Sequence, residues 1–288
     1  MSLKIGVSSF ILASPFSDAD LGVAAKVAKM GFTVLEICIE DPALLSAAAI
    51  NRAAQEHQLE ISICGAFGAD RDVSHEELAI RKGAVEYIKS CIDLAAAVGS
   101  KYVSGPMYSA TGKTRLLSPE LRQQQFDWAV ESLRAVGEYA ATKGVGLAIE
   151  PLNRFETDLI NTLEQGTRLC DAIGLINVGL LIDTFHMNIE EKSLTSAMEA
   201  AKKYIFHVQV SENDRGTPGS GQVHWDEFFS ALKSVDYKGS VVIESFLPTV
   251  AEIARAVSLW RPVASSMDCL ASDGFVFIRD SLVRAGLS

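Results

Sequence analysis

The feature that most constrains this chain is a regular alternation of short apolar runs with longer segments bounded by helix-start and helix-stop signals. Several runs, such as VGLLID and GSVVIE, are apolar almost throughout, which is typical of strands covered on both faces in a parallel sheet. The alternation therefore predicts an α/β fold. We expect eight strands, at Lys4–Phe10, Thr33–Ile39, Ile61–Cys64, Tyr102–Ser104, Val145–Glu150, Val178–Asp183, Tyr204–Val210 and Ser240–Phe246.

The segments between these runs carry residues that cap helices. A side-chain oxygen at the start of a helix accepts hydrogen bonds from the free N–H groups of the first turn, and proline is tolerated at the first helical position. Glycine commonly ends a helix because it adopts the left-handed conformation. We predict starts at Ser17 with Asp20, Ser74 with Glu77, Thr162 with Gln165, Asp41-Pro42 and Ser118-Pro119, and ends at Gly31, Gly99, Gly144, Gly174 and Gly239.

Eight strands that each precede a helix, with no linker or low-complexity segment among 288 residues, favour a single (β/α)₈ barrel domain spanning 1–288. Extra helical material is expected at the C-terminus, at Thr249–Trp260 and Gly274–Ala285. The alternative is a doubly wound open sheet with a second domain. Against it, the first strand-to-helix turn has no G-x-G-x-x-G, so the usual dinucleotide cradle is missing.

The composition excludes several classes of partner. Lysine and arginine number 26 against 36 acidic residues, a net charge of −10, which argues against nucleic acid and anionic membrane surfaces. No run approaches the roughly 18 apolar residues of a membrane span, and the first residues lead into a strand rather than a signal peptide. We expect a cytoplasmic protein with reduced thiols, since its cysteines are odd in number and widely spaced, at Cys38, Cys64, Cys91, Cys170 and Cys269.

Acidic residues close three of the late strands. In barrels of this kind the chemistry lies at the C-terminal ends of the strands, and the fifth, sixth and eighth runs end in Glu150, Asp183 and Glu244. Three carboxylates beside a core repel one another unless a cation binds them. Oxygen-rich ligands favour Mn²⁺ or Mg²⁺, with Co²⁺ acceptable. The alternative is that each acid caps the next helix or pairs with an arginine.

The loops after these strands add Glu156, His186 and Arg215, which are able to hold hydroxyl groups and a developing negative charge. Arg154 and Arg215 also fit ordinary surface ion pairs. The glycine-rich segment 216–221 lacks the Lys-Ser/Thr ending of a phosphate loop. The loop after the eighth strand has no basic residue, although barrel phosphate sites commonly use it. These two absences favour a neutral substrate.

Four motifs in register then resemble a known family: E-P-L-N-R-F-E at 150–156, D-T-F-H-M at 183–187, R-G-T-P-G-S-G at 215–221 and E-S-F at 244–246. They resemble the ketose 3-epimerases, the D-tagatose, D-allulose (psicose) and L-ribulose 3-epimerases of the xylose-isomerase-like barrels. The resemblance implies a metal-dependent isomerase that interconverts free ketohexoses or ketopentoses at C3 through an enediolate. It also implies a homodimer or homotetramer.

The resemblance implies roles for individual residues. Glu150, Asp183 and Glu244 match three ligands of a Mn²⁺-type ion. Glu150 and Glu244 also match the catalytic pair that takes and returns the C3 proton on opposite faces of the sugar. The side chains that contact the sugar near O1 to O3 are matched by Glu156, His186 and Arg215.

One position departs from the family pattern. The fourth metal ligand of the family, a histidine, falls at Gln209, and His207 lies two residues earlier on the same strand face. Two strand residues rise about 6.6 Å, so one of the two is expected to reach the ion. Gln209 is nearer the mouth, and an amide oxygen is an acceptable ligand for a hard cation. We predict Gln209 as the ligand and His207 as its support, which leaves the preferred metal open.

Other functions remain open on the same residues. An aldose–ketose isomerase or a cyclitol dehydratase would use a similar metal site. A DNA-repair endonuclease is disfavoured by five histidines in total and the negative charge, and a non-catalytic sugar-binding module by the acid/base pair. The preferred ketose depends on loop side chains, with candidates at Phe10, Cys64, Met107, Tyr108 and Phe246.

Overall fold

The computed structural model describes residues 2–288 and shows a closed parallel barrel. Within those residues eight strands pair in chain order, and β8 returns to pair with β1. The predicted (β/α)₈ barrel is therefore confirmed, and closure excludes the doubly wound open sheet. The strands are β1 Lys4–Ser8, β2 Val34–Ile39, β3 Glu60–Gly65, β4 Tyr102–Gly105, β5 Gly146–Ile149, β6 Val178–Asp183, β7 Ile205–Val210 and β8 Ser240–Ile243.

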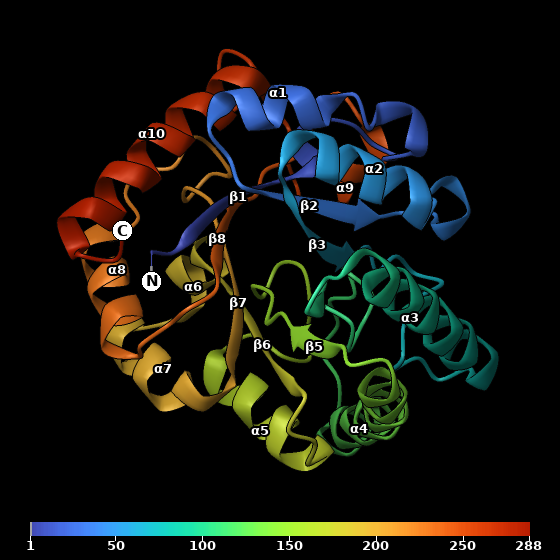
Figure 1. Ribbon diagram of the computed structural model, residues 1–288. Helices are drawn as coiled ribbons and strands as arrows, with labels where there is room; N and C mark the ends of the chain where they lie inside the picture. Colours follow the sequence, from blue (N-terminus) through green and yellow to red (C-terminus); the bar gives the residue numbers. More distant parts are fainter. Residues whose placement is uncertain (1) are drawn as a thin grey trace.

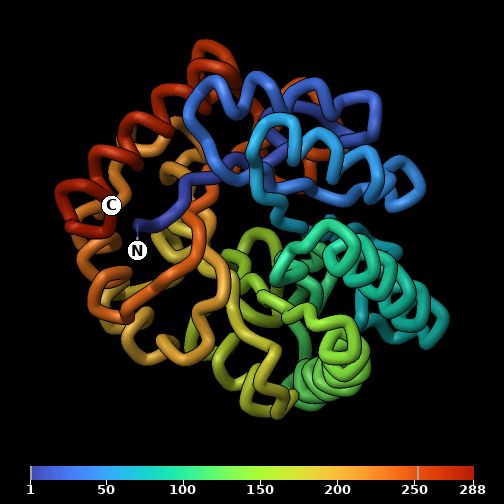
Figure 2. Tube along the Cα trace, viewed as in Figure 1, coloured from blue at the N-terminus to red at the C-terminus, as the bar shows by residue number. Residues whose placement is uncertain are grey.

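Helices surround this barrel (Figure 1). They are α1 Val23–Met30, α2 Ala47–His57, α3 Leu78–Val98, α4 Pro119–Thr142, α5 Leu163–Ile173, α6 Thr184–Glu190, α7 Leu194–Ala201, α8 Trp225–Ser234, α9 Ala251–Ala256 and α10 Met267–Ala285. Helix α10 packs against α8, β1 and β8 and completes the ring. The two ends of the chain lie together (Figure 2), because the backbone N–H of Leu3 donates to the carbonyl of Leu287 at 2.9 Å.

Several predicted strands are longer than the observed ones, chiefly at the mouth of the barrel. The first ends at Ser8 rather than Phe10, because Ser9–Ile11 wind into a 3₁₀ helix whose Phe10 N–H donates to Ser8 Oγ at 3.3 Å. At the N-terminal end of β7, Tyr204 belongs to a 3₁₀ turn and not to the strand. A local side-chain cap such as that of Ser8 competes with the strand ladder.

The fifth and eighth strands also end earlier than predicted, at Ile149 and Ile243. The ladder nevertheless continues for one hydrogen bond. Glu150 N–H donates to the carbonyl of Gly105 at 3.1 Å, and Glu244 N–H donates to that of Val210 at 3.0 Å. Both glutamates are therefore fixed at the C-terminal rim of the barrel.

Most of the predicted helix starts are confirmed. Capping boxes form at Ser17 with Asp20 and at Thr162 with Gln165, and Ser118 caps the helix that begins at Pro119. Asp41-Pro42 opens a short 3₁₀ helix, Pro42–Leu44, so α2 begins later, after Ser46.

The predicted start at Ser74 is wrong, since α3 begins at Leu78 with no side-chain cap. Ser74 Oγ instead donates to Asp72 Oδ1 at 2.7 Å, and Lys113 Nζ donates to Asp72 Oδ2 at 2.6 Å. Lys113, 39 residues away along the chain, also donates to Ser74 Oγ and so competes with the helix for this side chain.

Two other local predictions need correction. Gly31, Gly99, Gly144 and Gly174 have positive φ as predicted, but Gly239 does not, because the turn after α8 places Asp236 in the left-handed region instead. In the tail, the helix predicted at Thr249–Trp260 shortens to α9, while the one predicted at Gly274–Ala285 lies within the longer α10.

The core lies between the barrel and its helices, and β2, β5 and β6 are buried at every position. A smaller apolar cluster sits apart from it, made of Phe10, Cys38, Cys64, Phe246 and Leu259. All five cysteines are free, four of them buried, and Cys269 is exposed. No helix in residues 2–288 has the length and apolar character that crossing a membrane requires.

The barrel leaves no room for a side chain at Gly179 in β6. A Cβ atom there would lie 2.5 Å from the Tyr204 carbonyl oxygen and 2.6 Å from the Phe206 ring. We expect Gly179→Ala to lower the free energy of unfolding by about 1–3 kcal/mol, measured by urea denaturation. Gly22→Ala is the control, because nothing lies within 4 Å of its Cβ. Equal stability of the two variants would contradict this packing.

Candidate active site

Three buried carboxylates meet at the C-terminal mouth of the barrel. Glu150 follows β5, Asp183 ends β6, and Glu244 follows β8. Each side chain is at most 6% exposed. Ligand atoms of Glu150, Asp183 and His186 all lie within 4.8 Å of one another, which is close enough to hold a metal ion.

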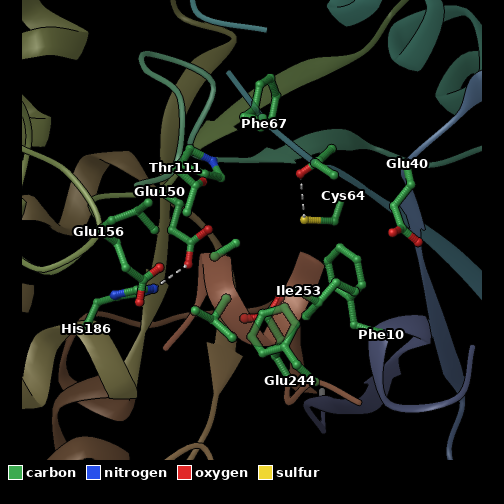
Figure 3. Close-up of a pocket in the computed structure, with 18 of the residues that line it drawn as sticks. Phe10, Glu40, Cys64, Phe67, Thr111, Glu150, Glu156, His186, Glu244 and Ile253 are labelled. Carbon is green, nitrogen blue, oxygen red and sulfur yellow. Dashed lines mark hydrogen bonds and ion pairs between the residues drawn. The ribbon is translucent and has the colours of Figure 1, made fainter. Parts of the chain in front are cut away.

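Glu150, His186 and Glu244 line a cavity of about 280 Å³. Figure 3 shows Glu150, Glu156 and His186 together on one side, with Phe10 and Cys64 across from them. Helix α9 contributes Ile253 and Ala256 to the lining, and Val257 follows the helix. The volume is just below the roughly 300–1,000 Å³ typical of ligand pockets, which suits a small molecule.

Arg215 joins the acidic residues at the centre of the site. Its Nη1 donates to Asp183 Oδ2 at 2.6 Å and to Glu244 Oε2 at 3.1 Å. The guanidinium carbon lies 4.0 Å from the ring centre of Phe185 and 5.1 Å from that of Phe246. Arg215 is 3% exposed, so the alternative of an ordinary surface ion pair is wrong for it. It is right for Arg154, which pairs with Glu190 at the surface.

The loop that carries Arg215 is organised around the buried carboxylate of Glu212. Glu212 Oε2 accepts hydrogen bonds from Gly219 N–H at 2.9 Å and from Trp225 Nε1–H at 3.0 Å. Its Oε1 accepts from Val223 N–H at 2.9 Å. The loop therefore folds around an anion of its own, and the N–H of Gly219 is already taken, as expected of a segment that is not a phosphate cradle.

Glu156 and His186 are linked through Asn153, a residue that sequence reasoning did not single out. Asn153 Nδ2 donates to Glu156 Oε1 at 2.8 Å, and Asn153 N–H donates to His186 Nδ1 at 2.9 Å. A backbone N–H and a guanidinium can only donate, and Arg215 Nη2 lies 3.0 Å from His186 Nε2, so both ring nitrogens face donors. Burial lowers the pKa of His186 to about 4, and the ring is therefore neutral.

These contacts define what His186 can do. Nε2 lies 3.3 Å from Glu150 Oε1, the contact drawn in Figure 3. Asn153 N–H and the Arg215 guanidinium already contact its two nitrogens. His186 therefore faces the cavity as a neutral ring, in keeping with a role toward substrate rather than metal.

Negative charge exceeds positive charge in this site. Burial raises the pKa of Glu150 well above its usual range, and the neighbouring Asp183 raises it further. Burial likewise raises the pKa of Glu244, although Arg215 opposes this effect. Arg215 alone does not compensate the carboxylates around it.

A second polar group lies in the barrel interior and involves Glu36, which the sequence did not single out. Glu36 Oε2 is 2.5 Å from His207 Nε2, and Ser62 Oγ donates to it at 3.0 Å. Gln209 Nε2 donates to Glu36 Oε1 at 2.6 Å. Burial by itself would raise the pKa of Glu36, but the charge of His207 and the bonds from its three partners hold it below its usual range.

Two buried oxygens suggest that a cation belongs here. Glu150 Oε1 and Gln209 Oε1 have no hydrogen-bond partner among residues 2–288. Unpaired buried acceptors are costly unless something positive contacts them. Carboxylate and amide oxygens are the ligands that hard divalent cations prefer. The donor set therefore fits a divalent metal.

Comparison with known proteins agrees with this geometry. The family model described as a xylose isomerase-like TIM barrel matches residues 24–263. A probable ketose 3-epimerase from Synechocystis sp. is 32% identical over 279 residues, which cover 97% of this chain and 96% of that protein. The chain belongs to the xylose isomerase-like TIM barrel family. Within it, the chain groups with the ketose 3-epimerases, which confirms the predicted resemblance and an enzyme of the isomerase class.

Solved structures of ketose 3-epimerases superpose on the whole chain. A D-allulose 3-epimerase from Methylomonas sp. in complex with D-allulose gives a TM-score of 0.90 at 30% identity, with 97% of each chain covered. An L-ribulose 3-epimerase gives a TM-score of 0.93 at 28% identity, covering 99% of this chain and 96% of that one. The overall fold is therefore shared with these ketose 3-epimerases.

The structure brings most of the predicted site residues to one cavity. Glu150, Glu156, His186, Arg215 and Glu244 line it, and Asp183 bonds to Arg215 beside it. Gln209 lies next to Asp183 in the sheet register.

Three of the five candidates for the far end of the sugar line the cavity as well: Phe10, Cys64 and Phe246. Met107 and Tyr108 do not, and both are fully buried. The Tyr108 hydroxyl donates to the carbonyl of Ile160 at 2.8 Å, so its role is packing and loop support.

The burial of His186 leads to a direct prediction. We expect its ring to stay neutral as the pH falls from 8 to about 5, because burial lowers its pKa to about 4. Long-range ¹H–¹⁵N spectra of histidine-labelled protein follow the titration, and the spectrum of His186→Asn assigns the resonance. A midpoint near the ordinary histidine pKa of about 6.5 would contradict the buried neutral ring.

Proposed function

We propose that this protein epimerises free ketoses at C3 with the help of a divalent metal. The observation that carries the proposal is the placement of Glu150 and Glu244. They project from β5 and β8, which are separated by two strands in the barrel, and line one small cavity from different sides. Inverting a carbon requires a base on one face of the substrate and an acid on the other, and two separated carboxylates supply both.

The proposed metal ligands are Glu150, Asp183, Gln209 and Glu244, with Mn²⁺ as the preferred ion and Co²⁺ or Mg²⁺ as alternatives. The carboxylates and the unpartnered oxygen of Gln209 support this set. A divalent ion bound there would polarise the ketone and the neighbouring hydroxyl, which stabilises the negative charge that develops when the C3 proton leaves.

The protein residues carry the proton steps. One of Glu150 and Glu244 accepts the C3 proton and the other donates a proton to the opposite face, with the roles exchanged in the reverse direction. Their high pKa values, caused first by burial, make each a stronger base than an exposed glutamate. Glu244 keeps Oε1 free of Arg215, and Glu150 Oε1 has no hydrogen-bond partner among residues 2–288.

Three further residues are proposed to hold the sugar. His186 places a neutral ring beside Glu150, and Arg215 offers positive charge close to Asp183 and Glu244. Glu156 offers an acceptor that is held in place by Asn153. Donors aimed at the position where charge develops lower the barrier, because they do not need to reorganise during the reaction.

The cavity favours a small neutral substrate. Among the described residues that line it, Arg215 is the one lysine or arginine, and its guanidinium is already paired with carboxylates. A phosphate group would meet Glu40, Glu150 and Glu244 instead of cations. Free ketohexoses and ketopentoses fit these limits, and related proteins are named D-psicose and L-ribulose 3-epimerases.

Removing either proton-transfer group should nearly abolish turnover. We expect Glu150→Gln and Glu244→Gln each to lower kcat by about 10²–10⁴-fold, since a positioned acid or base contributes about that much. Glu190→Gln is the control, because Glu190 pairs with the exposed Arg154 outside the cavity, and its activity should stay within about threefold. Wild-type-like activity of Glu244→Gln on D-fructose, D-tagatose and L-ribulose would refute the assignment.

Metal removal tests the reaction itself. We expect chelator-treated protein in D₂O to incorporate no deuterium at C3 of these ketoses, and Mn²⁺ to restore both exchange and the 3-epimer. Nuclear magnetic resonance follows the exchange, and chromatography identifies the product. Appearance of an aldose instead would indicate an isomerase, and full activity of the metal-free protein would contradict a metal mechanism.

A further inference from the structure

The barrel interior holds a hydrogen-bonded group that the proposed proton steps do not use. It consists of Glu36 on β2, Ser62 on β3, and His207 and Gln209 on β7. Strands β2 and β7 are not neighbours in the barrel, so the contacts of Glu36 with His207 and Gln209 cross its interior. Glu36 and Gln209 are both fully buried. A buried polar group of this kind is stable only if the donors and acceptors of its members are hydrogen-bonded.

The contact with Glu36 determines which way the amide of Gln209 points. Glu36 Oε2 shares a proton with His207 Nε2 at 2.5 Å and also accepts from Ser62 Oγ. Whichever of these two atoms carries that proton, Glu36 Oε1 remains an acceptor. Only the NH₂ group of Gln209 can pair with it, and it does so at 2.6 Å.

The amide oxygen of Gln209 is consequently turned away from Glu36. It is buried, and no donor reaches it within the described part of the chain. Gln209 pairs in register with Asp183 on β6, so the two side chains leave adjacent strands at the same level. Neighbouring strands lie about 4.8 Å apart. The side chain that carries the free oxygen is therefore a neighbour of Asp183, which belongs to the carboxylate cluster.

We propose that Glu36 is a positioning residue that presents the oxygen of Gln209 to the metal and so makes the donor set entirely oxygen. This inference rests on the proposed function, because it concerns the same metal. His186 does not add a nitrogen ligand, since Asn153 N–H donates to its Nδ1 and the Arg215 guanidinium, which can only donate, lies 3.0 Å from its Nε2. Glu150, Asp183 and Glu244 contribute only carboxylates.

An all-oxygen site has a different metal preference from one that contains imidazole. Imidazole nitrogen favours Co²⁺, Ni²⁺ and Zn²⁺, whereas carboxylate and carbonyl oxygens suit Mg²⁺ and Mn²⁺. The family resemblance puts a histidine at position 209. We therefore expect the ratio of Ni²⁺ to Mn²⁺ affinity to be lower for this chain than for a site that contains histidine. Glu36 preserves this metal preference because it prevents the Gln209 amide from flipping and presenting its NH₂ group to the metal.

The first test measures Mn²⁺ binding to metal-stripped protein by isothermal titration calorimetry. Glu36→Leu removes the acceptor, and we expect Mn²⁺ affinity to fall about 10–100-fold, the usual effect of losing a residue that orients a ligand. Glu36→Gln should recover part of the loss, because its amide oxygen can still accept from Gln209. Ser62→Ala is the control: it removes a bond to the same carboxylate without touching Gln209, and its affinity should change by less than about threefold.

A double variant shows whether Glu36 acts through Gln209. Gln209→Ala should weaken Mn²⁺ binding by itself, and adding Glu36→Leu should cause little further loss, since residues that act as one unit are not additive. Independent, additive losses would overturn the proposal. So would unchanged Mn²⁺ affinity of Glu36→Leu.

Gln209→His supplies a test that does not disturb Glu36. In this variant we expect electron-nuclear double resonance of bound Mn²⁺ to show a directly coordinated ¹⁴N, and the ratio of Ni²⁺ to Mn²⁺ affinity to rise about tenfold or more. The wild-type protein should show no directly coordinated nitrogen. A nitrogen ligand in the wild-type spectrum would overturn the all-oxygen site even if Glu36→Leu failed to fold.

These outcomes separate the inference from the proposed reaction. If the wild-type protein binds Mn²⁺ and Glu36→Leu weakens that binding through Gln209, the inference stands even when no ketose exchanges its C3 proton. If exchange occurs and Glu36→Leu binds Mn²⁺ normally, the reaction stands and the inference fails. If the wild-type protein binds no divalent ion, both are overturned.

Discussion

Burial of four carboxylates in one barrel end, with a single guanidinium among them, is the constraint on which the rest of this site depends. Glu36, Glu150, Asp183 and Glu244 are all nearly inaccessible, and unpaired buried charge costs several kcal/mol per ion. Arg215 pairs with two of them, and His207 pairs with Glu36. The remaining negative charge gives the site both its affinity for a cation and its basic carboxylates.

The barrel holds these groups at fixed positions by using backbone bonds and buried side chains that take no part in chemistry. The ladder continues through the N–H groups of Glu150 and Glu244, which fixes both residues at the rim. Asn153 holds the ring of His186 in place, and Glu212 folds the loop that carries Arg215. Such support matters because small errors in the geometry of catalytic groups cost large factors in rate.

Much of this arrangement follows from local sequence. Acidic residues that close apolar runs, as in LAIEP and LLIDTFH, predict carboxylates at the mouth of a barrel, because parallel strands all end on the same side. Strand boundaries were less predictable where a side-chain cap competes with the ladder, as at Ser8. Ser74 resembled a helix cap but bonds to Asp72 and Lys113 instead, because a long-range partner outcompeted the local one.

The sequence by itself determined the eight-stranded plan, the acids at the strand ends and the replacement of a histidine by Gln209. The tertiary structure decided how these residues are connected. Glu36 reads as an ordinary residue of an apolar strand, and its bonds to His207 and Gln209 span 171 and 173 residues. The orientation of the His186 ring likewise depends on a backbone group 33 residues away. Periodicity reports which face a side chain takes, but a hydrogen bond across a closed barrel depends on closure and register, which arise only when all the strands assemble.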